Sequence, residues 1–92
     1  MKYEVIIKPS VFKDLDKVQL EVVEKIFAKI ETLSQEPRQF GYKKLKNPKQ
    51  FSVKYKSLYR IKVGDYRIVY AIEDNIITVT VIGIGHRREI YE

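Results

Sequence analysis

The second half of the chain alternates apolar and polar side chains, and two short dipeptides interrupt that alternation. Gly64-Asp65 separates residues 58–63 from residues 66–73, and Asp74-Asn75 separates these from residues 76–84. Interruptions of two residues rich in Gly, Asn and Asp are typical of β-hairpin turns, and Gly64-Asp65 suits a type II′ turn. The pattern therefore predicts three antiparallel strands joined by two tight hairpins, and no other feature restricts the fold so strongly.

Two-residue turns also determine which residues lie opposite each other across the strands. The predicted pairs are all apolar or aromatic and share one face: Val63 with Tyr66, Ile61 with Ile68, Tyr59 with Tyr70, Ile72 with Ile77, Tyr70 with Val79 and Ile68 with Val81. The other face carries Arg60, Lys62, Arg67, Val69, Thr78, Thr80 and Ile82, with Lys62 directly opposite Arg67. A slip of one residue would turn the cations toward the core, so the register is well specified.

The first half of the chain predicts a strand, a helical region and a loop. Residues 3–8 alternate, with apolar side chains at the odd-numbered positions, and Pro9 ends this strand. Residues 37–50 combine Pro, Gly and Asn-Pro with basic residues and predict a loop. Residues 51–55 alternate again, which indicates a short extra strand or the start of a long one.

Helical spacing of apolar residues begins after Ser10, which is expected to cap the helix, and Pro37 ends it. The spaced residues are Phe12, Leu15, Val22, Ile26, Phe27, Ile30 and Leu33. One continuous helix over residues 10–36 would be long for so small a domain. A helical hairpin broken near residues 17–19 is therefore favoured over a single helix. The expected fold is α+β: an N-terminal strand and two helices packed on an antiparallel sheet.

Length and composition restrict the chemistry. Ninety-two residues make one domain, 1–92, and its 45% apolar content fills a modest core without a deep cavity, so chemistry is expected on an open face. Cysteine is absent, which excludes disulfides and fits a cytoplasmic protein. No acidic cluster with metal-ligand spacing appears, so no metal or other cofactor is expected. The chain also shows no secretory signal and no apolar run long enough to span a membrane.

Positive charge is concentrated in one window of the chain. Residues 38–67 hold ten basic residues and the single acid Asp65, whereas the chain as a whole carries a formal charge of +6. Arg60, Lys62 and Arg67 converge within this window on one sheet face, although like charges across a strand pair destabilise it. Violations of this kind concentrate at functional sites and favour a polyanion as partner. The alternative is a solvated surface on which these side chains splay into water.

The C-terminal residues 83–92 add a second group of polar side chains. The strand is expected to bring His86, Arg87, Arg88 and Tyr91 beside the cationic face, although two glycines allow it to bend. RNA transesterification needs a group that takes the 2′-OH proton, a group that protonates the 5′-oxygen, and cations that stabilise the phosphorane. These residue types match that need without a metal ion.

The segments 58–70 and 85–91, LYRIKVGDYRIVY and GHRREIY, resemble the RelE/ParE toxin superfamily. The resemblance covers nearly the whole chain. It implies a RelE-like fold and a toxin that cleaves messenger RNA in the ribosomal A site, giving a 2′,3′-cyclic phosphate. It also implies a cytoplasmic location and a RelB-like antitoxin, small, acidic and encoded by the adjacent gene. Toxin and antitoxin are then expected to form a heterotetramer when the toxin is inhibited.

The resemblance also assigns roles to individual residues. Arg60 and Lys62 match two basic residues that serve in catalysis on the strand before the hairpin. The family usually has lysine at the first position, and an arginine there cannot give up a proton near neutral pH, which leaves charge stabilisation. Arg67 matches a phosphate contact, Arg87 a transition-state arginine, and Tyr91 a terminal tyrosine that orients or exchanges protons. His86 is at a variable position and is a candidate for the acid or base.

Ribosomal RNA or the antitoxin is expected to contact the remaining basic residues, which are Lys43, Lys44, Lys46, Lys54, Lys56 and Arg88. Two other functions stay open at the level of sequence. A ParE-like toxin would poison DNA gyrase, and a passive RNA-binding module would bind RNA with strong salt dependence and no cleavage.

Overall fold

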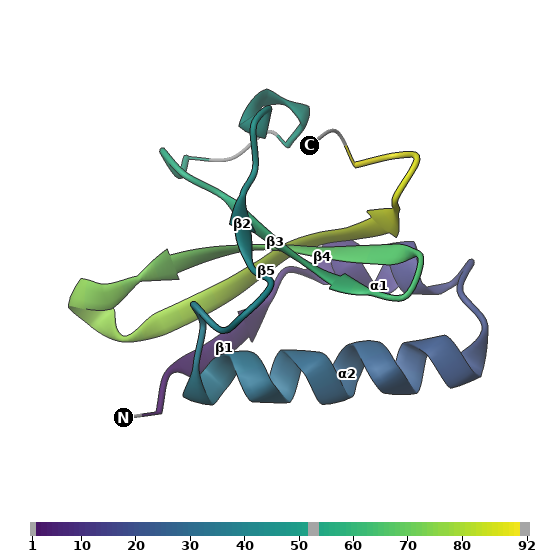
Figure 1. Ribbon diagram of the computed structural model, residues 1–92, viewed down its shortest axis with the longest axis horizontal. Helices are drawn as coiled ribbons and strands as arrows, with labels where there is room; N and C mark the ends of the chain where they lie inside the picture. Colours follow the sequence, from purple (N-terminus) through teal and green to yellow (C-terminus); the bar gives the residue numbers. More distant parts are fainter. Residues whose placement is uncertain (1, 52–53, 91–92) are drawn as a thin grey trace.

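Two helices cover one face of a five-stranded sheet (Figure 1). The computed structural model describes residues 2–51 and 54–90. In chain order the elements are β1 (Glu4–Ile7), α1 (Pro9–Leu15), α2 (Leu20–Gln35), β2 (Lys43–Lys44), η1 (Pro48–Gln50), β3 (Tyr59–Val63), β4 (Tyr66–Glu73), η2 (Asp74–Ile76) and β5 (Thr78–His86). The strand order is β1-β5-β4-β3-β2, so β4 is central. The predicted α+β fold is confirmed.

The helical hairpin is confirmed, with α1 and α2 separated by residues 16–19. Lys8 is the N-cap of α1 and Pro9 the first helical residue, where its missing N–H leaves no donor unsatisfied. The prediction that Ser10 caps this helix was therefore wrong, because the proline starts the helix one residue earlier. Glu36, which precedes Pro37, has an extended φ of −146° and ends α2, as expected for a residue before proline.

Sheet pairing is antiparallel from β2 to β5, whereas β1 joins the edge of β5 in parallel, with Val5 opposite Val79. The predicted register of the first hairpin is confirmed at all five positions of β3, from Tyr59 opposite Tyr70 to Val63 opposite Tyr66. Gly64 has a φ of +58° and Asp65 does not have a positive φ, as a type II′ turn requires. The turn chemistry of Gly64-Asp65 therefore set the register of β3 on β4.

The second hairpin differs from its prediction. A 3₁₀ turn, η2, replaces the two-residue turn, and Ile77 follows it in the left-handed region with a φ of 49°. The longer turn shifts the pairing by two residues, so that Ile72 lies opposite Val79 and Tyr70 opposite Val81. Even shifts keep side chains on the same face. Further along, Val69 pairs with Gly83, which leaves Ile82 as the extra residue of a β-bulge.

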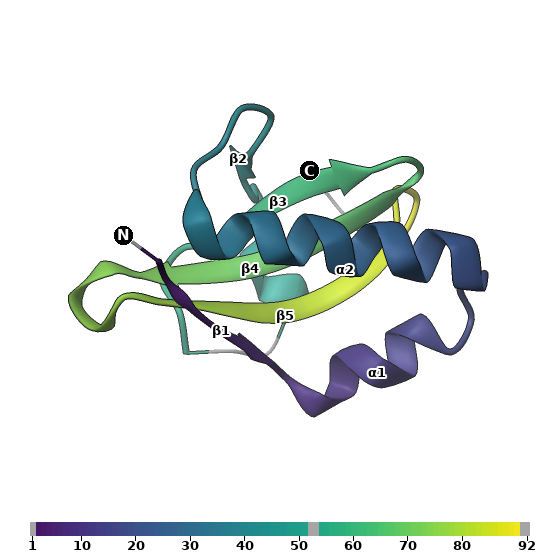
Figure 2. The same ribbon diagram turned by 90° about the horizontal axis from the view of Figure 1, so that it is seen from below.

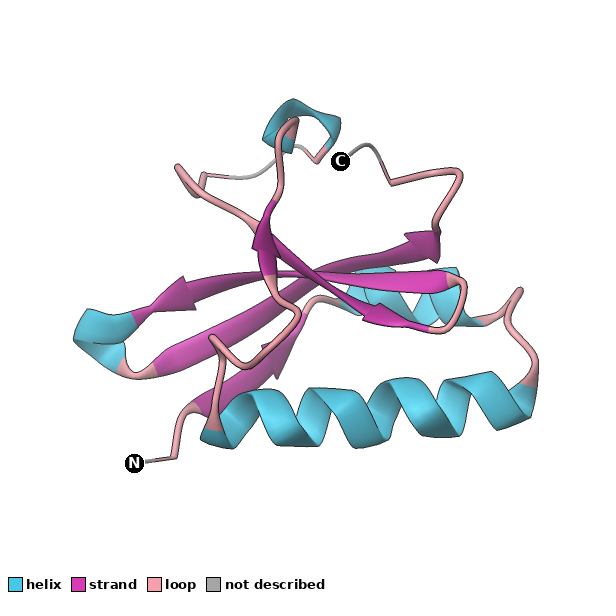
Figure 3. Cartoon of the chain, in the orientation of Figure 1, coloured by secondary structure: helices cyan, strands magenta, loops and turns pink. Residues whose placement is uncertain are grey.

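The region between α2 and β3 is more ordered than a loop (Figure 3). Residues 43–44 pair with β3 as β2, and residues 48–50 form η1, both within the segment predicted as a loop. Residues 51, 54 and 55 form no strand, so the extra strand predicted for 51–55 is absent from its described part. Among the described residues, no helix has the length and apolar content to cross a membrane.

Apolar residues form two cores, one on each face of the sheet. The first lies on the sheet face that the helices cover, and Figure 2 shows the helices over this face. It contains Val11, Leu15, Ile26, Ile30, Leu33, Ile61, Ile68, Tyr70, Val79, Val81 and Ile84. The second lies on the other face and contains Leu45, Leu58, Val69, Ala71, Ile82 and Ile90, with Phe51 and Tyr55 packed against it. Phe12 and Phe27, predicted on the apolar helical face, are instead 52% and 38% exposed, because the buried stripe of each helix is narrower than the apolar pattern.

Close approach at two glycines of β5 lets the second core form. A Cβ atom at Gly83 would lie 2.6 Å from a ring carbon of Phe51, and one at Gly85 would lie 2.8 Å from Cδ1 of Ile90. These glycines thus do more than let the strand bend, because they leave room for the segments that cover this face.

A polar cluster ties three distant segments together. The Arg38 guanidinium donates to both carboxylate oxygens of Asp74 at 3.0 and 2.7 Å, and the Tyr3 hydroxyl donates to Oδ1 at 2.6 Å. These hydrogen bonds lower the pKa of Asp74 to about 2. The cluster connects the start of β1 and the segment after α2 to the turn between β4 and β5.

Substituting Gly83 tests the close approach. We expect Gly83→Ala to lower the free energy of unfolding by about 1–3 kcal/mol, because the new methyl group overpacks the site. Urea denaturation measures this change. If the Phe51 ring causes the loss, Phe51→Ala costs less in the Gly83→Ala background than alone. Additive losses would contradict a clash with this ring.

The pH dependence of stability tests the Asp74 cluster. Its pKa is lower in the folded than in the unfolded chain, so the stability that it contributes is complete above about pH 4 and is lost as the pH falls toward 2. Wild type and Asp74→Asn should therefore differ in unfolding free energy near neutral pH and converge in acid. Urea denaturation along a pH series measures this, with Glu24→Gln as the control. A difference that stays constant down to about pH 2 would contradict the assignment.

Candidate functional site

Arg60, Lys62 and Arg67 occupy one sheet face, as predicted, and we call them the cationic face. Lys62 lies directly opposite Arg67 across β3 and β4. Their exposure differs from the prediction, because Arg60 and Arg67 are only 4% and 6% exposed while Lys62 is exposed. The expectation of an open face was therefore wrong for the two arginines. The second core, which the sequence did not predict, covers this side of the sheet.

Arg67 and Arg87 are both held at the tight turn between β3 and β4. The Arg67 side chain donates from Nη1 to the carbonyl oxygens of Gly64 and Tyr66, at 3.3 and 3.2 Å. The Arg87 backbone N–H donates to the Asp65 carbonyl at 2.7 Å, and its Nε lies 3.8 Å from the Asp65 carboxylate. The backbone of this turn therefore holds two cations close together, Arg67 from β4 and Arg87 from the C-terminal tail.

Arg60 connects the cationic face to the segment before β2. Its Nη1 donates to the Gly41 carbonyl at 3.4 Å, and its backbone pairs with Lys43. Both residues of β2, Lys43 and Lys44, are exposed. This edge of the sheet is therefore basic on its outer side.

His86 lies on the opposite face from the cationic residues. It pairs with Tyr66, and the two rings meet edge to face at 5.5 Å on the helix side of the sheet. The predicted position beside Arg67 was wrong, because the bulge at Ile82 inserts one residue into β5 and reverses the side-chain alternation beyond it. The Nδ1 atom of His86 accepts the Arg88 backbone N–H at 3.2 Å, which leaves Nε2 as the nitrogen free of that contact.

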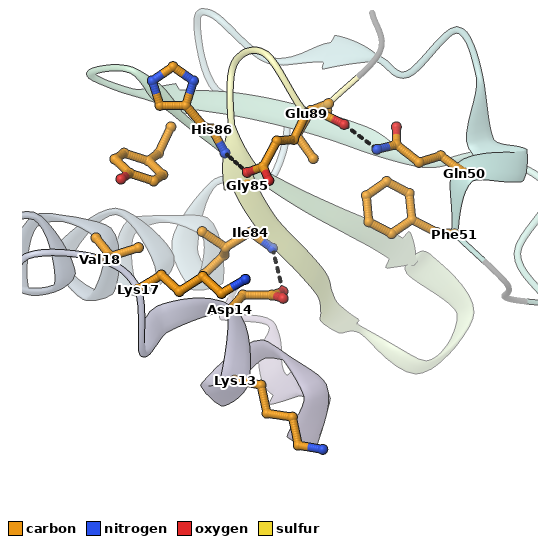
Figure 4. A pocket seen from close by; sticks show the side chains of 12 residues that line it. Lys13, Asp14, Lys17, Val18, Gln50, Phe51, Ile84, Gly85, His86 and Glu89 are labelled. Carbon is orange, nitrogen blue, oxygen red and sulfur yellow. Dashed lines mark hydrogen bonds between the residues drawn. The ribbon is translucent and has the colours of Figure 1, made fainter.

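A groove of about 420 Å³ runs along the edge of β5 beyond the end of β1 (Figure 4). His86 lines it, and none of the three residues of the cationic face does. Its other polar lining comes from Lys13 and Asp14 of α1, from Lys17 in the segment after α1, and from Gln50, Tyr66 and Glu89. Sequence reasoning missed these residues, because α1 and the segment after it reach the end of β5 only in the tertiary fold.

Two carboxylates cap the exposed backbone of β5 in this groove. Asp14 Oδ2 accepts the Ile84 N–H at 3.1 Å, and Glu89 Oε1 accepts the His86 N–H at 3.0 Å (Figure 4). Unpaired strand edges invite pairing with another chain, and charged side chains suppress it. The two carboxylates therefore protect this strand edge, and the groove holds acidic as well as basic side chains.

The other predicted RNA contacts are on the surface. Lys43, Lys44, Lys46, Lys54, Lys56 and Arg88 are all exposed. Lys54 lies over the Tyr55 ring, with Nζ 5.7 Å from its centroid. Tyr91 lies outside the described residues, so its role stays a prediction. Among the described residues, no group of three or more His, Asp or Glu side chains could hold a metal ion.

A sequence profile described as ParE toxin of type II toxin-antitoxin system, parDE, matches residues 5–91. The chain belongs to the RelE/ParE toxin superfamily. This makes it a toxin of a type II toxin–antitoxin system, as the resemblance of its hairpin and tail implied. No curated protein sequence matches the chain significantly.

Solved structures of RelE toxins share the fold. The chain is similar to the RelE–RelB complex of Pyrococcus horikoshii, with a TM-score of 0.74, 24% identity, and coverage of 95% of this chain and 97% of that chain. It is similar to the toxin–antitoxin complex RelBE2 of Mycobacterium tuberculosis, with a TM-score of 0.73, 22% identity, and coverage of 95% and 100%. The RelB–RelE complex of Methanococcus jannaschii gives 0.68, 25%, and 95% of both chains.

Charge reversal at Lys62 tests the like-charge pair. We expect Lys62→Glu to raise the free energy of unfolding by about 0.2–1 kcal/mol, because it replaces repulsion across the strands by attraction to Arg67. Urea denaturation at low salt measures the gain, which should shrink as salt is added. Lys44→Glu, on β2 opposite the uncharged Tyr59, is the matched control. A loss of stability on Lys62→Glu would contradict the electrostatic account of this pair.

Proposed function

We propose that this toxin is an endoribonuclease that cleaves messenger RNA in the ribosomal A site. The observation that carries the proposal is the convergence of Lys62, Arg67 and Arg87 around one tight hairpin. A phosphodiester in its transition state carries extra negative charge, and fixed cations stabilise it. The similarity to RelE structures supports the same class of reaction.

The proposed reaction is a transesterification without a metal ion. The ribose 2′-oxygen forms a bond to the adjacent phosphorus, and the bond from phosphorus to the 5′-oxygen breaks. The products are a 2′,3′-cyclic phosphate and a 5′-OH end. One proton must leave the 2′-OH, and another must reach the departing 5′-oxygen.

The arrangement of the site divides these tasks. Lys62 is the residue of the cationic face that solvent and substrate reach, so we assign the 2′-OH proton to it. Arg67 and Arg87 supply positive charge at the hairpin. Arg60 is buried and supplies positive charge from within the cationic face. His86 is less suited to be the base, because it lies on the other face with Tyr66. Tyr91 is assigned to the leaving group by resemblance alone.

Partners follow from the same proposal. The ribosome would position the message, because none of the three residues of the cationic face lines the groove beside β5. The exposed lysines at positions 43, 44, 46, 54 and 56 and Arg88 would bind ribosomal RNA. A cognate, acidic RelB-like antitoxin would neutralise the toxin in the cytoplasm as a heterotetramer. Solved relatives that are complexes with RelB support the antitoxin.

Gyrase poisoning is the second candidate, because the matching family profile is described as ParE. A poison of this kind needs a surface that docks on gyrase and needs no phosphate chemistry at the hairpin. The two functions therefore differ in their dependence on Lys62 and Arg87.

A translation extract tests the proposal. Adding the purified toxin should produce message ends inside codons, with a cyclic phosphate on the upstream fragment. Lys62→Ala and Arg87→Ala should each slow cleavage by roughly a hundredfold or more, because each removes a proton acceptor or a transition-state cation. Lys25→Ala, on α2, is the control and should cut at the wild-type rate.

A supercoiling assay with purified gyrase runs in parallel. Uncut message together with inhibited supercoiling would replace the proposal by gyrase poisoning. Salt-dependent RNA binding without cleavage or gyrase inhibition would indicate a passive RNA-binding module.

A further inference from the structure

Phe40 exposes its whole side chain to solvent, with a relative exposure of 103%. The other exposed large apolar residues among those described range from 38% to 73% exposed. A solitary exposed apolar residue is common on protein surfaces. Phe40 differs because the backbone that carries it is tightly held.

The turn beneath Phe40 is fixed by several hydrogen bonds. Tyr42 N–H donates to the Gln39 carbonyl at 3.1 Å, which closes a β-turn with Phe40 and Gly41 at its centre. Gly41 has a φ of +96°, as the third residue of a type II turn requires. The Gln39 amide donates to Thr32 Oγ1 and to the Glu36 carbonyl, at 3.0 and 3.1 Å. The ring is thus presented from a structured support.

The same turn is connected to the cationic face. Arg60 donates to the Gly41 carbonyl, so the backbone beside Phe40 contacts a proposed functional residue directly. Tyr42 turns its ring inward against Tyr59, with centroids 5.6 Å apart. The turn therefore packs the Tyr42 ring against the fold and directs the Phe40 ring to solvent. Figure 2 shows the segment between α2 and β2 standing away from the body of the fold.

Charge around Phe40 favours a nucleic acid as the partner. Lys43 and Lys44 follow it on the edge strand, and both are exposed. On the other side of the turn, the charge of Asp74 is balanced by its ion pair with Arg38, and Glu36 is the nearest acid in the sequence. Aromatic side chains flanked by cations bind single-stranded nucleic acid, because the ring stacks on a base while the cations contact phosphates. A fully exposed ring also has a free face on which a base can stack.

We infer that Phe40 is a stacking platform for an unpaired nucleobase of RNA, with Lys43 and Lys44 as phosphate contacts. The inference deepens the proposed function and rests on it for the kind of RNA that the toxin meets. The base belongs either to the message or to ribosomal RNA, and both present the same π face to the ring.

Binding measurements with two probes test the inference. One probe is a short single-stranded RNA that carries 2-aminopurine and is 2′-O-methylated, so it cannot be cleaved. The other is the ribosome with an empty A site. Phe40→Ala should weaken binding of at least one probe by about tenfold, whereas Phe40→Trp should keep it. Loss with the oligonucleotide assigns the base to the message, and loss with the ribosome alone assigns it to ribosomal RNA.

Two controls separate stacking on a base from an apolar contact with a protein. Phe40→Leu keeps an apolar side chain without a π face and should bind as weakly as Phe40→Ala, whereas Ile76→Ala, at another exposed apolar residue, should bind like wild type. Phe40→Leu binding like wild type would indicate the apolar contact and overturn the inference. Unchanged binding by Phe40→Ala, or no binding by wild type, would also overturn it. Binding that depends on Phe40 without any cleavage would instead refute the proposed function alone.

Discussion

Strand β4 is central in the sheet and buried on both faces, and the positions of the candidate site residues depend on this. One face packs on the helices and the other on the second core. Arg67 lies on this strand, so its guanidinium is largely removed from water and requires hydrogen-bond partners. The carbonyls of Gly64 and Tyr66 meet part of that requirement. The turn that closes the hairpin therefore also fixes the direction of a cation.

Cations of the site consequently fall into two kinds. Arg60 and Arg67 are buried and bonded to backbone carbonyls, so their charge is fixed in place. Lys62 is exposed, and the Arg87 side chain is 56% exposed, so both can meet a ligand directly. Preorganised charges that need no rearrangement are effective in stabilising a transition state. The cost is the like-charge pair of Lys62 and Arg67 across β3 and β4, which lowers the stability of the sheet.

The sequence was informative where local chemistry decides the structure. The positive φ of Gly64 follows from its residue type, and the register of β3 on β4 followed correctly. The second hairpin could not be read in this way, because a β-branched residue, Ile77, adopts the left-handed conformation that sequence patterns assign to Gly or Asn. Gly83 indicated that this strand could bend, but it did not determine that a bulge at Ile82 would move His86 to the helix face. The burial of Arg60 and Arg67 depends on segments distant in the sequence and is a property of the tertiary fold.

The parallel pairing of β1 with β5 also affects when the toxin can fold during its synthesis. Residues 4–7 leave the ribosome early, but their partners in the sheet, residues 78–81, are made more than seventy positions later. Contacts of such sequence separation form late, because the intervening chain must first be ordered. Synthesis from the N-terminus therefore yields a strand without its neighbour until most of the chain has emerged. A growing chain would thus complete its sheet only near the end of its synthesis, so most nascent chains lack the fold that positions the candidate site.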